Sequence, residues 1–204
     1  MKTNIAIFAS GNGSNAQAIM DACKQGVINA NVAIIITDNP SAFVIQRAAK
    51  ANIDCKVFKP KIFVDKAAYE TEILKELTEY KVEFIVLAGY MRLVGKQLLQ
   101  AFPKKIVNIH PSLLPKYKGL NAVQQALNNN DKELGVTIHY VDAGMDTGEI
   151  IAQEKITIEN LDEPLESIMA KVHNIEHELY VETLAKIMNF ELQNKINNSL
   201  IDNQ

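Results

Sequence analysis

Asn108 and His110 are two positions apart, near the end of the apolar segment 106–109. On an extended chain, side chains at this spacing point to the same side. Pro111 follows directly and disfavours a helical conformation at His110, so the chain leaves the segment in an extended direction. An amide and an imidazole aimed into one cleft can stabilise a developing oxyanion and move a proton.

A carboxylate that would complete this set is Asp146, which lies between Gly144 and Gly148. The two glycines give the loop the freedom to wrap a ligand, but the same composition is typical of an ordinary turn. Asn108 alone could cap a strand end, and a single histidine is commonly structural. Together, Asn108, His110 and Asp146 are our candidate catalytic residues.

The segments that must position these residues alternate between strand and helix. Apolar runs predict strands at 4–9, 32–37, 55–58, 84–88, 106–109, 135–141 and 150–158, and helical spacing predicts helices at 16–22, 42–51, 66–80, 122–128 and 163–190. Such alternation predicts an α/β fold with a doubly wound, mostly parallel sheet. Ligands in this architecture bind beyond the carboxyl ends of the strands.

Length and composition limit the organisation and the partners. A chain of 204 residues with 48% hydrophobic content predicts a single domain, which we assign to residues 1–193, followed by a polar tail, 194–204, expected to fray. The net charge of -3 gives no general attraction to nucleic acid. We expect small-molecule substrates. The apolar face of the 163–190 helix fits either a core or a partner, so monomer and homodimer both stay open.

The remaining residue patterns argue against several other classes. Cys23 and Cys55 have no ligand spacing, and His173 and His177 have no third ligand at a suitable distance, so we expect no metal. No apolar run approaches the length of a membrane span, and 5–9 is too short for a signal-peptide core, which predicts a cytoplasmic protein without a membrane partner. His139, in a predicted strand, is expected to be structural or supporting.

The glycine-rich segment 11–16 matches the G-x-G-x-x-A form of the dinucleotide fingerprint, and Asp38 lies where a ribose-binding acid would be. The polar side chains of Asn12, Ser14 and Asn15, and the lack of a hydride-transfer partner, weaken that interpretation. A helix N-terminus of this kind equally suits one phosphate monoester. A tight turn without a ligand is the third alternative.

Arg92 follows the most strand-like segment, 84–88, and would emerge at the same edge of the sheet. An arginine in this place is often simply solvated. Beside apolar Met91, Leu93 and Val94, it could instead hold the carboxylate of a ligand whose flat ring lies on that wall.

These motifs occur in an order and at a spacing that resemble the phosphoribosylglycinamide formyltransferases, a folate-dependent family of purine synthesis. The resemblance runs almost end to end and is carried by segments 10–15, 87–92, 108–119 and 135–148. It implies a single-domain, Rossmann-like formyltransferase fold. It also implies formyl transfer from 10-formyltetrahydrofolate to the glycyl amine of glycinamide ribonucleotide, in IMP biosynthesis, with neither a metal nor a redox cofactor.

The resemblance also implies roles for individual residues. The ribose phosphate of the substrate would be held by Gly11, Asn12, Gly13, Ser14 and Asn15, which replaces the dinucleotide interpretation. The active site would be Asn108, His110 and Asp146, with Glu176 meeting the substrate amine. The folate site would be lined by Met91, Arg92, Leu93, Val94, Val141 and the loop that reaches Asp146.

One residue departs from the family pattern, and two other functions compete with this one. Asn121 occupies a position where many relatives have a histidine, so we expect a changed contact there with activity retained. A formyl hydrolase would use water in place of the amine, but it would not need the glycine-rich loop. A regulatory nucleotide-binding module would not need Asn108, His110 and Asp146. The related methionyl-tRNA formyltransferases carry an extra C-terminal domain and differ in the first loop.

Overall fold

The computed structural model describes residues 2–160 and 163–201, which form one seven-stranded sheet between helices. The strands are β1 (Thr3–Phe8), β2 (Ala30–Thr37), β3 (Cys55–Val57), β4 (Phe84–Leu87), β5 (Ile106–His110), β6 (Glu133–Tyr140) and β7 (Ile150–Thr157). Their order in the sheet is β3-β2-β1-β4-β5-β6-β7. Strands β1 to β5 pair in parallel, whereas β6 and β7 are antiparallel additions at one edge. The predicted mostly parallel sheet is confirmed.

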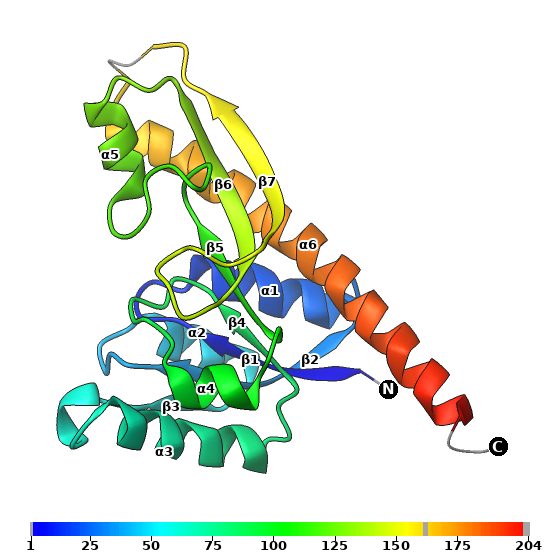
Figure 1. Cartoon of the computed structure of the whole chain (residues 1–204). Helices are drawn as coiled ribbons and strands as arrows, with labels where there is room; N and C mark the ends of the chain where they lie inside the picture. Colours follow the sequence, from blue (N-terminus) through cyan, green and yellow to red (C-terminus); the bar gives the residue numbers. More distant parts are fainter. Residues whose placement is uncertain (1, 161–162, 202–204) are drawn as a thin grey trace.

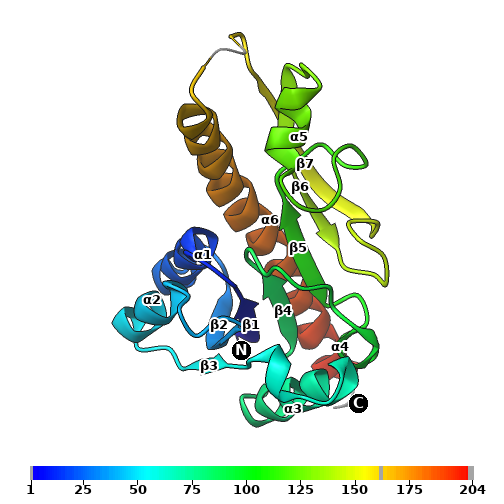
Figure 2. The same cartoon turned by 90° about the vertical axis from the view of Figure 1, so that its left-hand side faces the viewer.

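Helices cover both faces of the parallel part of the sheet (Figures 1 and 2). They are α1 (Ser14–Gln25), α2 (Val44–Ala51), α3 (Lys66–Glu79), α4 (Lys96–Ala101), α5 (Ala122–Asn128) and α6 (Leu165–Ile201), with a 3-10 turn at Pro60–Ile62. Alternate side chains of β1 enter separate cores, because successive strand residues point to opposite faces. Ile5 and Ile7 pack with α1, α2 and α6, and Ala6 and Phe8 pack with α3 and α4.

The strand order reverses between β1 and β4. From β1 the chain proceeds to β2 and β3 on one side, and from β4 to β5 on the other. The loops that leave β1 and β4 therefore diverge and open a crevice at the carboxyl ends of these strands, which is where ligands bind in doubly wound sheets. Asn108 and His110, on β5, lie at the same edge.

Two helical features differ from the sequence prediction. Helix α4 was not predicted, because its six residues are too few to display a helical pattern. The last helix begins at Leu165 and continues to Ile201, so the tail expected to fray from residue 194 is helical through residue 201. Neither glycine nor proline follows residue 164 to stop the helix. Residues 202–204 of that expected tail lie outside the described residues.

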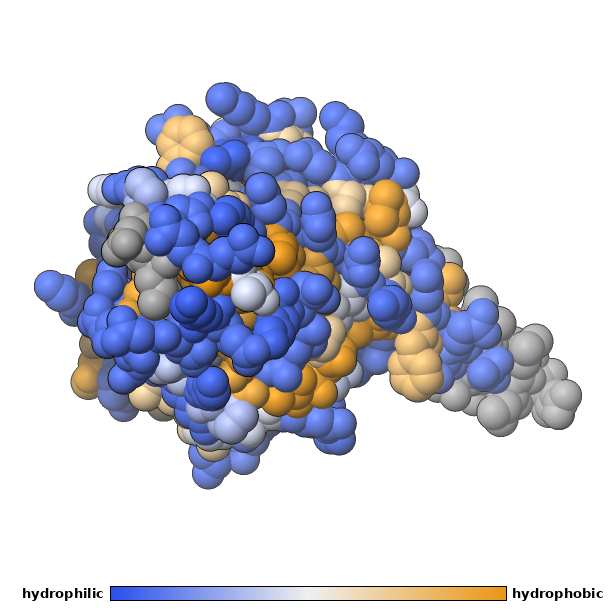
Figure 3. Space-filling view, turned by 90° about the horizontal axis from the view of Figure 1, so that it is seen from above, coloured by the Kyte–Doolittle hydropathy of each residue, from blue (hydrophilic) through white to orange (hydrophobic). Residues whose placement is uncertain are grey.

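The surface is mixed in character. Seen from above, hydrophilic side chains form most of it, and hydrophobic ones show in patches between them (Figure 3). None of the helices in the described part of the chain combines the length and hydropathy that crossing a bilayer requires.

Candidate functional site

A cleft of about 1130 Å³ lies at the carboxyl edge of the sheet. The loops after β1, β4, β5 and β6 line it together with the N-terminal half of α6. All of the site residues predicted from the sequence line this one cleft: Gly11, Asn12, Gly13, Ser14, Asn15, Met91, Arg92, Leu93, Val94, Asn108, His110, Val141, Asp146 and Glu176. Residues more than 160 positions apart thus meet at one place, as the doubly wound topology requires.

His110 is buried at the end of β5, and its two ring nitrogens have different neighbours. Nε2 lies 2.8 Å from the carbonyl oxygen of Tyr117, to which it must donate because a carbonyl only accepts. Nδ1 lies 3.5 Å from Oδ2 of Asp146. That distance exceeds an ordinary hydrogen bond, so Nδ1 remains available to a group in the cleft.

Asp146 is held by its loop in a conformation that non-glycine residues rarely adopt, with φ of 52°. Its Oδ2 accepts the backbone N–H of Gly119 at 2.8 Å, and its Oδ1 lies 3.7 Å from Nε2 of His139. The carboxylate is therefore fixed between two imidazoles. Strain of this kind persists where surrounding contacts enforce it, and it is common at functional sites.

His139 orients the side chain of Asn108. Its Nδ1–H donates to the carbonyl oxygen of Tyr140 at 2.8 Å, which leaves Nε2 as an acceptor for the amide of Asn108 at 3.1 Å. Burial lowers the pKa of His139, which favours this neutral ring. One amide hydrogen of Asn108 is thereby donated to His139. No other described residue accepts the second hydrogen, so it is available to a ligand in the cleft. The expected supporting role of His139 agrees with these contacts.

The glycine loop, residues 11–15, follows β1 and continues into the first turn of α1. Gly13 is the N-cap of α1 with φ of 75°, a region that favours glycine. A Cβ atom there would also lie 2.6 Å from Cγ2 of Val44 on α2. The loop thus brings backbone N–H groups and the positive end of α1 to the cleft, an arrangement suited to an anion.

Asn15 and Glu176 form a buried pair across the cleft. The Asn15 amide donates to Oε2 of Glu176 at 3.1 Å, so this side chain is directed toward α6. Burial raises the pKa of the Glu176 carboxyl, whereas the Asn15 hydrogen bond and the charges of His173 and His110 lower it. The buried Oδ1 of Asn15 has no hydrogen-bond partner among the described residues, and so it could accept a donor from a ligand.

The segment 91–94 forms a second wall of the cleft. Met91 and Leu93 are 63% and 55% exposed, whereas Val94 is buried. Exposed apolar side chains lining a cleft suit a flat, weakly polar ligand. Nη1 of Arg92 lies 3.6 Å from Oδ2 of Asp38. Asp38, the candidate ribose acid of the dinucleotide interpretation, is therefore paired with an arginine.

Some residues of the cleft were missed by sequence reasoning. Ser10 ties the two walls together, because its Oγ accepts the Met91 N–H at 2.9 Å and its N–H donates to the Gly89 carbonyl oxygen. Leu165 and Met169 of α6 also line the cleft. Their helical spacing predicted an apolar face for either a core or a partner, and only the three-dimensional packing shows that these two side chains line the cleft. The described residues contain no group of three His, Cys, Asp or Glu able to hold a metal ion.

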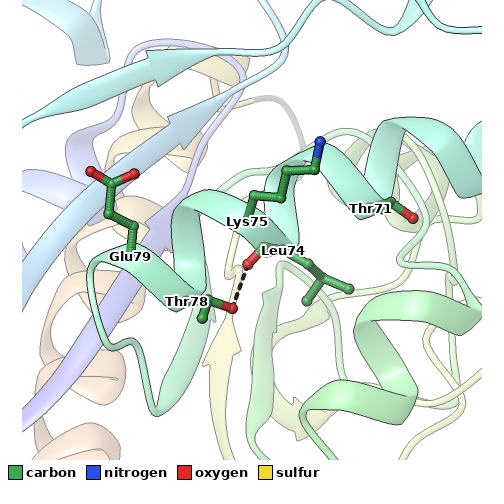
Figure 4. Close-up of a pocket in the computed structure, with 5 residues that line it drawn as sticks. All are labelled: Thr71, Leu74, Lys75, Thr78 and Glu79. Carbon is green, nitrogen blue, oxygen red and sulfur yellow. Dashed lines mark hydrogen bonds between the residues drawn. The ribbon is translucent and has the colours of Figure 1, made fainter.

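A second hollow, of about 520 Å³, lies along α3 and is lined by Thr71, Leu74, Lys75, Thr78 and Glu79 (Figure 4). All of these side chains come from one helix. The hydrogen bond drawn there joins Thr78 Oγ1 to the carbonyl oxygen of Leu74 on the same helix. Because no other element in the described part of the chain contributes a polar group, this hollow lacks the converging groups of a binding site.

The fold agrees with comparisons to known proteins. The profile of the formyl transferase family matches residues 3–184. The chain therefore belongs to the formyl transferase family. It is 48% identical over 183 residues to phosphoribosylglycinamide formyltransferase of Bacillus subtilis (strain 168), covering 90% of this chain and 93% of that protein.

Other phosphoribosylglycinamide formyltransferases also match the chain over most of its length. The phosphoribosylglycinamide formyltransferase of Escherichia coli (strain K12) is 36% identical over 201 residues, covering 98% of this chain and 94% of that one. The crystal structure of the protein of that name from Bacillus halodurans matches with a TM-score of 0.88 at 50% identity, covering 91% of this chain and 95% of the other. Within its family, the chain belongs with the phosphoribosylglycinamide formyltransferases.

Proposed function

We propose that this enzyme transfers the formyl group of its co-substrate, 10-formyltetrahydrofolate, to the glycyl amine of N1-(5-phospho-D-ribosyl)glycinamide, in de novo purine biosynthesis. The observation that carries the proposal is that Asn108, His110 and Asp146 line the same cleft as the glycine loop and the 91–94 wall. An anion-binding loop and an apolar wall in one cleft suit two ligands held in contact. Such contact supplies much of the acceleration in a direct transfer.

In this mechanism the amine nitrogen attacks the formyl carbon, and a tetrahedral species with negative charge on oxygen forms. The free amide hydrogen of Asn108 and a protonated Nδ1 of His110 donate to that oxygen. Because His139 and the Tyr117 carbonyl hold these two donors in place, they need no rearrangement as charge develops. Loss of one such donor typically costs about a hundredfold to a thousandfold in turnover.

The bond between the formyl carbon and N10 of the folate then breaks, and the amine proton must reach N10. Asp146 faces His110 Nδ1 at 3.5 Å and stabilises its protonated form by charge. A carboxylate in this position takes up and delivers the proton, through water where the direct distance is too long. Glu176, held by Asn15, receives the amine end of the acceptor.

The two ends of the cleft bind the remaining parts of the ligands. The glycine loop binds the ribose phosphate through its N–H groups and the N-terminus of α1. The pterin ring of the folate lies on 91–94 and Val141, and Arg92 meets a carboxylate of the folate tail. Both ligands are small molecules, and we expect neither a nucleic-acid nor a membrane partner. Cys23 and Cys55 are free thiols, which fits our prediction of a cytoplasmic location.

A single assay tests the proposal. The protein is incubated with 10-formyltetrahydrofolate, with and without the glycinamide ribonucleotide, and loss of the formyl-folate is followed. We expect turnover only when the amine is present. Turnover without the amine would identify a formyl hydrolase, and no turnover in either mixture would leave a binding module.

A further inference from the structure

We propose that Arg47, on α2, is a positioning residue for the glycine loop. It holds the loop from the side that faces α2, so that backbone N–H groups point toward the phosphate of the acceptor. It also adds positive charge near that phosphate. The inference rests on the proposed function. Arg47 lies outside the residues that line the cleft, and no sequence motif pointed to it. Its role follows from its contacts with the loop.

The guanidinium of Arg47 donates two hydrogen bonds to Asn12 of the glycine loop. Its Nε donates to the carbonyl oxygen of Asn12 at 2.8 Å, and one terminal nitrogen donates to Oδ1 of the same residue at 2.7 Å. The other terminal nitrogen reaches Oε1 of Gln17 at 3.5 Å. A planar fork can hold a backbone and a side-chain oxygen at once, which a lysine ammonium does with less geometric control.

These contacts set the direction of the loop donors. In a trans peptide unit, the C=O and the following N–H point in opposite directions. The carbonyl oxygen of Gly11 accepts the Val44 N–H at 3.2 Å, so α2 lies behind that peptide and the Asn12 N–H points the other way. The Asn12 carbonyl faces Arg47 in the same manner, which turns the Gly13 N–H away from α2 and toward the cleft.

The charge of Arg47 is available to act on the cleft. Arg47 is half-buried, with its guanidinium 5.0 Å from the centre of the Phe43 ring. No carboxylate in the described part of the chain forms an ion pair with it. Its positive charge therefore adds to that of the α1 N-terminus, and a phosphate dianion in the loop is attracted to both.

The experiment compares Arg47→Met, Arg47→Lys and a matched control, Lys50→Gln, which removes a positive charge from an exposed position of the same helix. KM and kcat are measured with the phosphorylated acceptor and with its unphosphorylated riboside, and inorganic phosphate is used as a competitive inhibitor. We expect Arg47→Met to raise KM for the phosphorylated acceptor and Ki for phosphate about tenfold, the scale of one charge-assisted hydrogen bond. For Arg47→Lys we expect KM and Ki to lie between those of the wild type and those of Arg47→Met. For Lys50→Gln we expect both values to match the wild type.

The readouts separate a phosphate-specific role from a structural one. For Arg47→Met we expect kcat within about twofold of the wild type and unchanged KM values for the folate and for the riboside. An equal rise in KM for the riboside, or an unchanged Ki for inorganic phosphate, would overturn the proposal. If the wild type failed to formylate the phosphorylated acceptor, the proposed function would fail instead, and a thermal-shift titration with inorganic phosphate would still test Arg47.

Discussion

At the scale of single residues, the site pairs each chemical group with a partner that fixes its protonation or direction. The Tyr117 carbonyl selects the protonated nitrogen of His110, and the Tyr140 carbonyl selects that of His139. Asp146 lies between the two rings. A reaction that creates and removes charge within one turnover benefits from this arrangement, because the donors are already oriented.

The first residue-scale prediction concerns Asp146. Asp146→Asn keeps an oxygen for the Gly119 N–H but removes the charge that favours protonated His110, so we expect kcat to fall about a hundredfold with both ligands still bound. The control is Asp21→Asn, the same change at an exposed position of α1 outside the cleft, where the carboxylate accepts from Gln17. Steady-state kinetics and equilibrium binding are the measurements. Full turnover with an unchanged pH profile in Asp146→Asn would refute the assignment.

The second residue-scale prediction is that His139 makes the stability of the fold depend on pH. Burial holds its folded pKa below the ordinary value of 6.5, so at lower pH the unfolded chain takes up a proton that the folded protein does not. This contribution to stability is complete above pH 6.5 and is lost as the pH falls from there toward the folded pKa, at up to about 1.4 kcal/mol per pH unit. Urea unfolding between pH 7.5 and 5.5 should show a shallower loss for His139→Gln than for the wild type. If the unfolding free energies of the two proteins changed equally with pH, His139 would be excluded as a source of the pH dependence.

At the scale of elements, α6 joins the core to the site. Glu176 faces the cleft, and Tyr180, one turn later, is buried in the core. The Tyr180 hydroxyl lies 2.9 Å from the Leu87 carbonyl oxygen of β4, to which it donates, and 3.3 Å from that of Val107 on β5. The helix is thereby fixed to the two strands that lead into the proposed folate wall and the candidate catalytic residues.

We expect Tyr180→Phe to lower the free energy of unfolding by about 1–3 kcal/mol, because two buried carbonyl oxygens lose their shared donor without a change of side-chain shape. Denaturant unfolding measures this loss. The natural comparison is Tyr80→Phe, whose hydroxyl contacts Asp54 at an exposed position and should cost less. Equal losses in the two variants would mean that the contact with β4 and β5 does not contribute.

Much of the element pattern could be predicted from the sequence, because buried parallel strands are continuously apolar. The segments around β1, β2, β4 and β5 were found within a residue or two. Helix α4 was too short to give a signal, and the end of α6 was misjudged from polarity alone. For the site, the motifs predicted Asn108, His110 and Asp146 as a set, and the structure brings these three residues to one cleft. The Tyr117 carbonyl and the Arg47 contact with Asn12 depend on loop paths that side-chain patterns do not encode.

At the scale of the whole molecule, the site is divided between the parallel and antiparallel parts of one sheet. β1, β4 and β5 lead into the glycine loop, the proposed folate wall and the candidate catalytic pair, whereas β6 carries His139 and leads into the Asp146 loop. A ligand that fills the cleft therefore connects both parts of the sheet and α6. Binding should stabilise the protein globally.

Each ligand should accordingly raise the melting temperature. At a hundred times its dissociation constant, a ligand adds about 2.7 kcal/mol, which for a chain of this size corresponds to roughly 5 °C or more. Differential scanning calorimetry with each ligand alone, and with the acceptor plus unformylated tetrahydrofolate, is the measurement. A ligand that left the melting temperature unchanged at saturation would not bind the folded cleft.

The shared helix α6 has a consequence for how the enzyme can vary. Glu176, which we propose to meet the acceptor's amine, is carried by the helix that also fills the core, so its position is set by the packing of the protein interior. The loop 142–149, which carries Asp146, is mostly exposed, and none of its described side chains enters either hydrophobic core. Adaptation to differently sized folates can therefore proceed through that loop, whereas a substitution that shifts α6, even deep among its packed residues, would first be detected as a changed affinity for the acceptor.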